Sequence, residues 1–261
     1  MQVLETFLHN NGFSFYTREN PATDHTEDIF FCHKDSHRLW RAFPDVLLID
    51  TTYKTNMYDW PFVQFVGVTS TSKSFCIAHA FLIREREQNF TWALGKLKEM
   101  LDDYIEPRVI VTDRDKALMN SCDTVFPYAT KNLCRWHISE NIKKKYKSLY
   151  QTDAGETFGY FWKVLYTSPT VEDFYYNCGK MEANLARHGR RGKLFTRVQL
   201  LPTILPYISL THRFYFLQRF GNTLITTGWS LTKKSLCVVG LTISETMASI
   251  QQTGWRANMR T

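Results

Sequence analysis

The stretch DVLLID at residues 45–50 is an uninterrupted apolar run that begins and ends with an aspartate. Because it lacks the alternation of a half-exposed strand, it predicts a central strand that is covered on both faces and projects Asp50 into an open site. A second run of this kind, RVIVTD at residues 108–113, also ends in an acid, Asp113. Together the two runs indicate a sheet that presents two carboxylates at strand ends.

Two more apolar runs lie between these strands. Residues 62–69 and 75–83 are rich in β-branched and aromatic side chains, and the polar link that joins them predicts a hairpin turn. Residues 89–104 then change to a helical period, with Asn89 as the candidate N-cap. Three strands, a helix, a strand and a helix predict an α/β fold, a mixed sheet with flanking helices that matches an RNase-H-like core. Element order alone leaves other α/β folds open.

The rest of the chain is assigned more coarsely. The elements expected there are a helix at residues 1–15, a loop at 16–28, a strand at 29–32, a helix at 34–43, a helix at 114–122, a strand at 128–133, a helix at 138–150 and a further helix that Ser168 and Pro169 open. We therefore divide the chain into three parts: a helical and loop lead-in at residues 1–44, an RNase-H-like core with the start of a helical insertion at residues 45–187, and a degenerate C-terminal segment at residues 188–261.

Composition places the chain among globular proteins. Of its 261 residues 44% are hydrophobic and 15% are aromatic, which excludes a disordered chain. No apolar run is long enough for a transmembrane helix, and the N-terminus lacks the pattern of a secretory signal. The six cysteines form no C-x-x-C pair, which favours reduced thiols in the cytosol or the nucleus.

Positive charge accumulates towards the C-terminus. The net charge is +7, and residues 183–261 contain 11 Lys and Arg residues but a single acid, Glu245. This asymmetry is typical of a tail that binds nucleic acid. The basic residues are scattered among apolar ones, however, so a degenerate sequence that no longer encodes the natural end of the fold explains the pattern equally well.

The chemistry of the two strand-end acids indicates a metal site. Two carboxylates that face one cleft can hold divalent ions for an in-line displacement at phosphorus, and hard oxygen ligands suit Mg²⁺ or Mn²⁺. The structural alternative is that Asp50 and Asp113 only cap turns. Asp115, which lies two residues beyond Asp113, is interpreted as a helix cap or a surface residue.

Four segments together resemble the transposase domain of Mutator-like elements (MULE), which also occurs in plant far-red-impaired-response transcription factors. They are DVLLIDTTYK at residues 45–54, the hairpin through residues 78–80, VIVTDRDKA at 109–117 and NLCRWHISEN at 132–141. The resemblance covers roughly residues 25–185. It implies an RNase-H-like domain with a DDE-type triad, in which Asp50 and Asp113 are the first two acids and bind Mg²⁺ or Mn²⁺. It also implies DNA as the partner, a nuclear location after synthesis in the cytoplasm, and no membrane association; self-association is left open.

The resemblance extends to a C-x-x-H element formed by Cys134 and His137. Their spacing is that of half a zinc site, but zinc is not expected because no second pair stands nearby. The pair either shapes the active site or contacts DNA, as the resemblance implies, or forms a buried structural contact. The basic residues that follow either contact DNA phosphates or form a solvated helix face; they are Lys143, Lys144, Lys145 and Lys147. Trp92, Trp136 and His79 are interpreted as core residues.

The third acid of the family is missing from its expected place. In the family this Glu follows an F-G-N-T sequence, which is present here at residues 220–223, but Trp229 occupies the corresponding position. Glu245 is the alternative third acid, although its surroundings do not match. The sequence therefore predicts an impaired transposase, or else a catalytically silent, transposase-derived DNA-binding protein. An RNase-H-like nuclease that acts on RNA–DNA hybrids is the third hypothesis.

Overall fold

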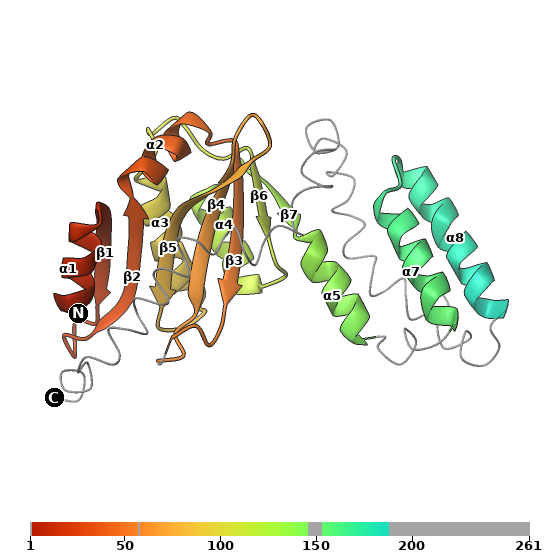
Figure 1. Ribbon diagram of the computed structural model, residues 1–261, viewed down its shortest axis with the longest axis horizontal. Coiled ribbons are helices and arrows are strands. Elements are labelled where there is room, and N and C mark those ends of the chain that lie inside the picture. Colours follow the sequence, from red (N-terminus) through yellow and green to blue (C-terminus); the bar gives the residue numbers. More distant parts are fainter. Residues whose placement is uncertain (1, 57, 146–152, 188–261) are drawn as a thin grey trace. The chain divides into compact units, whose positions relative to one another are not determined.

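A computed structural model describes residues 2–56, 58–145 and 153–187 of the chain (Figure 1). These residues belong to two compact units, one up to Lys131 and the other from Asn132 onward, and each is described by itself. The segment at residues 188–261, with Trp229 and Glu245, lies outside the described residues.

The first unit is built on a seven-stranded mixed sheet. Its order is β1 (Phe13–Glu19), β2 (Thr26–His33), β5 (Ser74–Leu82), β4 (Phe62–Val68), β3 (Val46–Thr52), β6 (Val109–Thr112) and β7 (Thr130–Leu133). β3 pairs with β6 in parallel, whereas β1–β2, β2–β5, β5–β4 and β4–β3 are antiparallel. The helices of this unit are α1 (Gln2–Asn10), α2 (Lys34–Ala42), α3 (Glu87–Lys98) and α4 (Lys116–Val125). The predicted class, an RNase-H-like α/β fold with flanking helices, is confirmed.

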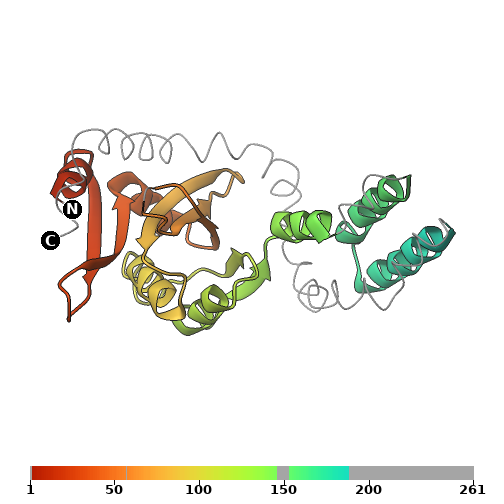
Figure 2. The same ribbon diagram turned by 90° about the horizontal axis from the view of Figure 1, so that it is seen from below.

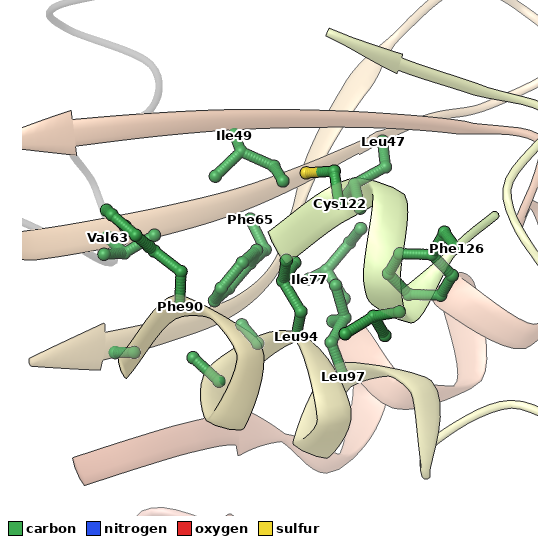
Figure 3. Packing of buried hydrophobic residues seen from close by; sticks show 14 of the residues in the cluster. Leu47, Ile49, Val63, Phe65, Ile77, Phe90, Leu94, Leu97, Cys122 and Phe126 are labelled. Carbon is green, nitrogen blue, oxygen red and sulfur yellow. The ribbon is translucent and has the colours of Figure 1, made fainter. Parts of the chain in front are cut away.

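The main core lies between the sheet and the pair α3 and α4, which lie side by side on one face (Figure 2). Figure 3 shows the packing of Leu47 and Ile49 from β3 with Leu94 of α3 and Cys122 of α4. Successive residues of a strand point to opposite faces, so Leu48 and Asp50 point to the other face and are half-buried. The uninterrupted apolar run predicted that β3 is covered on both faces. This prediction is wrong, because only the face with Leu47 and Ile49 is fully buried.

The N-terminal segment adds two strands to the sheet, where a loop and one short strand were predicted. Residues 13–19 form β1, and β2 begins at Thr26. The alternation of FSFYTRE explains β1, because Phe13 and Phe15 pack against the cluster in which α1 covers Phe31 and Phe81. The lead-in thus completes the sheet.

The second unit contains helices only after β7 has ended. They are α5 (Arg135–Lys145), α7 (Asp153–Tyr166) and α8 (Val171–Arg187). α7 was not predicted. The start of α8 was placed too early, because Thr170 is its cap and its Oγ1 accepts a hydrogen bond from the Asp173 amide at 3.0 Å. Phe174, Cys178 and Met181 are buried, as the predicted stripe requires.

No helix in the described part of the chain is both long and apolar enough to cross a bilayer. The five cysteines that the structure describes are free thiols, as predicted; they are Cys32, Cys76, Cys122, Cys134 and Cys178.

Gly67 supports a close approach between β4 and β5. It pairs with Phe75, and a Cβ at this position would lie 2.4 Å from Cζ of that ring. Gly67→Ala is therefore expected to lower the free energy of unfolding by about 1–3 kcal/mol through overpacking, measured by urea denaturation. The matched control is Gly95→Ala in α3, where an added Cβ meets no atom within 4 Å and a gain of about 0.5–1 kcal/mol is expected. A Gly67→Ala protein as stable as the wild type would contradict the packing described.

His79 is a core residue of β5, as predicted, but only one of its ring nitrogens is satisfied. Its ring stacks on Phe62 at 5.1 Å, and Nε2 lies 3.1 Å from the Sγ atom of Cys76. Nδ1 is buried and has no hydrogen-bond partner among the described residues. Burial lowers the pKa of His79 from 6.5 to about 4, so the imidazole stays neutral in the folded protein.

The stability of the protein is expected to fall on acidification because of His79. As the pH falls below 6.5, His79 becomes protonated in the unfolded chain, whereas in the folded chain it is protonated only near pH 4. The free energy of unfolding therefore decreases between these two pH values. The full effect is about 3 kcal/mol. Urea denaturation measures the loss in free energy of unfolding between pH 7 and pH 4.5. This loss should be smaller for His79→Phe than for the wild type, whereas the exposed control His25→Phe should lose as much as the wild type. Equal losses in all three proteins would refute the assignment.

Candidate active site

Asp50 lies in β3, and Asp113 directly follows β6, the strand that pairs with β3 in parallel. The pairing of β3 with β6 sets Val46 against Val109 and Leu48 against Val111, and the same register continued by two residues brings Asp50 level with Asp113. Both aspartates are half-buried. Asp50 was predicted to be the last residue of its strand. Instead, β3 continues to Thr52, and Asp50 pairs with Gln64 of β4. The adjacency of the two strands is thus established, and a cleft shared by the two carboxylates stays a prediction.

A third loop reaches the same edge of the sheet. β3 and β5 are both antiparallel to β4, so they run in the same direction and their C-terminal ends lie at one edge. Tyr53, which follows β3, donates a hydrogen bond of 2.5 Å from its hydroxyl to Oε2 of Glu85, which follows β5. This contact joins the two loops directly.

The loop after β6 begins at the same edge of the sheet, because β6 is parallel to β3. Burial raises the pKa of Glu85, the hydrogen bond from Tyr53 lowers it, and the charges of Asp115 and Asp113 raise it further. The pKa of Tyr53 is raised, mainly by burial. The hydrogen bond to Glu85 and the negative charges of Glu85, Asp113 and Asp115 raise it further. The loops after β3, β5 and β6 therefore begin at one edge of the sheet, and the contact between Tyr53 and Glu85 joins the first two of them.

Sequence reasoning missed Glu85 but assigned Asp115 correctly. The Asp115 carboxylate accepts a hydrogen bond of 2.8 Å from the amide of Leu118 and caps α4, as predicted. The signal for Glu85 was present, because it follows the apolar strand β5 at short range, as Asp113 follows β6. Asn89 is not the cap of α3, since the helix begins at Glu87 and Asn89 is buried inside its first turn.

Asp28 of β2 anchors the loop that carries Glu85. Its carboxylate is fully buried and accepts hydrogen bonds from the amide of Ile83 at 3.0 Å and from Nδ2 of Asn89 at 3.0 and 3.1 Å. Arg18 of β1 completes the network with an ion pair to the same carboxylate. Burial raises the pKa of Asp28 more than these three partners lower it. The desolvation of the carboxylate is therefore only partly offset by its hydrogen bonds and ion pair. The network ties β1, β2, α3 and the loop after β5 together.

The donor set at this edge fits a hard divalent cation. Carboxylate oxygens are the ligands that Mg²⁺ and Mn²⁺ prefer, and Asp50 and Asp113 supply them from two neighbouring strands. Within residues 2–56, 58–145 and 153–187, no three His, Cys, Asp or Glu side chains form a group that could hold a metal ion. The two positions considered for a third acid, Trp229 and Glu245, lie outside these residues.

The remaining predicted site residues belong to the second unit. Cys134 is buried directly before α5, and His137 is half-buried one turn later. Lys144 is exposed, Lys143 and Lys145 lie in α5, and Lys147 lies outside the described residues. No contact tests their predicted roles.

Of the two tryptophans predicted to lie in the core, only Trp92 packs against it. Trp136 is 44% exposed, because it is offset by two helical positions from the buried Ile138 and so points away from it.

Comparison with known proteins confirms the resemblance on which the site assignment rests. Residues 46–141 match the family model of the MULE transposase domain. The chain is similar to the protein FAR1-RELATED SEQUENCE 5 of Arabidopsis thaliana, with 26% identity over 178 residues that cover 67% of this chain and 22% of the relative. It is also similar to FAR-RED IMPAIRED RESPONSE 1 of the same plant, with 26% identity over 166 residues, 60% of this chain and 20% of the relative.

A fungal relative has a different name. The PKS-NRPS hybrid synthetase cheA of Chaetomium globosum is 33% identical over 111 residues, which cover 40% of this chain and 2% of that protein. The chain spans about a fifth of the length of the two plant relatives. The match of residues 46–141 to the MULE transposase domain, together with the similarity to the two plant proteins, supports a transposase-related origin of this part of the chain.

Proposed function

We propose, from the similarity of residues 46–141 to the MULE transposase domain, that this chain carries the catalytic core of a DDE-type transposase that cleaves and transfers DNA strands. Its activity is impaired, because Trp229 stands where the family's third acid is expected. Its partner is DNA, and it acts in the nucleus. The observation that supports the proposal is the parallel pairing of β3 with β6, whose register, if continued by two residues, sets Asp50 opposite Asp113.

The residues of this chain would divide the work as follows. Asp50 and Asp113 would hold Mg²⁺ or Mn²⁺, which when bound would stabilise charge at a scissile phosphate and acidify a water molecule. Asp115 caps α4 and so fixes the loop that carries Asp113. The hydrogen bond from Tyr53 to Glu85 fixes the loop after β3 against the loop after β5. The acids are thus held by secondary structure before any substrate arrives, which is a requirement for electrostatic catalysis.

The proposal is tested by metal binding to the full chain. Titration calorimetry with Mn²⁺ compares the wild type with Asp50→Asn and Asp113→Asn. Loss of a ligand's hydrogen-bond partner typically costs about 10–100-fold in metal affinity, so loss of the ligand itself should cost at least that. Asp35→Asn is the matched control, because Asp35 is an exposed acid on α2. Equal Mn²⁺ affinity in all four proteins would overturn the proposal.

Cleavage assays then separate the two functional hypotheses. Conversion of supercoiled plasmid DNA to nicked or linear forms in Mn²⁺, lost in Asp113→Asn, supports the impaired transposase. Mn²⁺ binding and DNA binding without any cleavage would instead support the catalytically silent, transposase-derived DNA-binding protein.

A further inference from the structure

We propose that the exposed basic residues that follow β3, β5 and β6 form a rim that contacts the phosphates of duplex DNA around the acidic centre. We call this set the basic rim; its members are Lys54, Arg84, Arg86, Arg114 and Lys116. The inference rests on the proposed function and adds to it the surface that holds the substrate.

The first observation is that the rim shares its loops with the acids. Lys54 follows Tyr53 after β3, Arg84 and Arg86 flank Glu85 after β5, and Arg114 lies between the two aspartates after β6. The hydrogen bond from Tyr53 to Glu85 joins two of these loops, and the charges of Asp113 and Asp115 act on both of its partners. Because β3, β5 and β6 run in the same direction, the five basic residues lie at one edge of the sheet, four of them in loops and Lys116 at the first position of α4.

The second observation is a difference in exposure. Asp50, Glu85, Asp113 and Asp115 are all half-buried, whereas every member of the basic rim is exposed. Acid and base alternate in the runs RER at residues 84–86 and DRDK at 113–116; the next acid, Glu87, is exposed and begins α3. In extended backbone, such as that of Arg86 and Asp115, successive side chains point in opposite directions, so alternation separates an inner acidic layer from an outer basic one.

The third observation is that four of the five rim residues form no ion pair with the acids of their loops among the described residues. Lys and Arg form ion pairs with Asp or Glu elsewhere in the described residues, at Asp28, Asp35, Asp102, Glu99 and Asp123. Lys54, Arg84, Arg86 and Lys116 make no ion pair or side-chain hydrogen bond within the part of the chain that the structure describes, although acids lie in the same loops. Their charges stay available to an external polyanion.

The combination fits a nucleic-acid backbone. A polyanion cannot approach bare carboxylates without repulsion, and a surrounding rim of lysine and arginine offsets that repulsion on either side of the phosphate that reaches the acids. Each phosphate contact also releases counterions, which makes the affinity depend steeply on salt concentration. The rim therefore predicts binding that is independent of DNA sequence and sensitive to salt.

The test compares two triple variants of the full chain with equal charge change. The rim variant is Lys54→Gln, Arg84→Gln and Lys116→Gln, one substitution after each of the three strands. The control variant is Lys34→Gln, Lys73→Gln and Arg108→Gln. These exposed residues lie at the opposite edge of the sheet, Lys34 at the first position of α2 and the other two in loops. Binding to a random-sequence duplex DNA is measured by fluorescence anisotropy in EDTA over a range of salt concentrations, and thermal unfolding confirms that both variants are folded.

The rim variant is expected to bind on the order of 10²-fold more weakly at moderate salt, with a salt slope reduced by about 3. The control variant should bind as the wild type does. Equal losses in both variants would show that only net charge matters and would overturn the rim. Unchanged DNA binding in the rim variant would also overturn the rim. Polyglutamate and duplex RNA are measured in the same way, and a loss of their binding without any loss of DNA binding would overturn it as well.

Because EDTA removes metal from the assay, its outcome is independent of the catalytic proposal. Loss of DNA binding in the rim variant with no Mn²⁺ binding to the wild type would keep the rim and reject the transposase chemistry. Normal binding in the rim variant with Mn²⁺-dependent cleavage by the wild type would do the reverse.

Discussion

Asp28→Ala is expected to lower the free energy of unfolding by about 3–5 kcal/mol, which is a large part of the stability of a domain of this size. The Asp28 carboxylate is fully buried and accepts hydrogen bonds from the Ile83 amide and the Asn89 side chain. Removing it leaves these donors and the partly exposed Arg18 without the acceptor that they share in the folded protein. Urea denaturation of the two proteins at pH 7 measures the difference.

Two comparisons give this result its meaning. Asp35→Ala removes an acid whose ion pair with Arg38 is exposed, and a change within about 1 kcal/mol is expected. In the double variant Arg18→Met and Asp28→Leu the buried charges disappear together, so the loss should be clearly smaller than in Asp28→Ala. A double variant less stable than Asp28→Ala would show that the ion pair itself, rather than the unpaired groups, provides the stability.

Trp229→Glu is expected to raise Mn²⁺-dependent DNA cleavage by on the order of 10²–10³ over the wild type. This is the typical effect of one group that stabilises charge in the transition state, although groups that act as a unit are not additive. The gain should disappear when Trp229→Glu is combined with Asp113→Asn, because both acids are needed for the same displacement. The measurement is the rate at which a DNA substrate that carries the ends of the element is cut.

Glu245→Gln identifies the alternative third acid. If wild-type activity is abolished by Glu245→Gln, the third acid has moved to position 245 and Trp229→Glu should add little. Full wild-type activity that survives Glu245→Gln would contradict the impairment altogether, since no third acid would then be required.

Strands with strong local signals could be predicted from the sequence. β3, β4, β5 and β6 are apolar runs that the core must bury, and the stripe of α3 from Phe90 to Leu101 has a clear helical period. The adjacency of β3 and β6 was expected because each run is fully apolar and closes with an acid, and the parallel pairing of the two strands agrees with it. These features depend on hydrophobic pattern, which a single sequence displays directly.

Other features depend on long-range contacts that a sequence does not display. β1 reads as a polar segment until α1 provides an apolar cluster for Phe13 and Phe15. The sequence around Asn89 is typical of a helix cap. Its side chain instead donates hydrogen bonds to Asp28 of β2, a strand that lies far away in the sequence. Glu85 joined the site only because β5 runs parallel in direction to β3, which follows from strand order rather than from local sequence.

The parallel pairing of β3 with β6 also determines when the site is assembled during folding. Val46 and Val109 are far apart in sequence, so their contact closes a long loop, whereas the β4–β5 hairpin and α3 form from local contacts. The two aspartates thus come together in a late step, after most of the intervening chain is ordered. If Asp50 and Asp113 hold a metal ion as proposed, metal affinity should report on completion of the sheet, and partial opening of β6 should release the ion before the hairpin loses its structure.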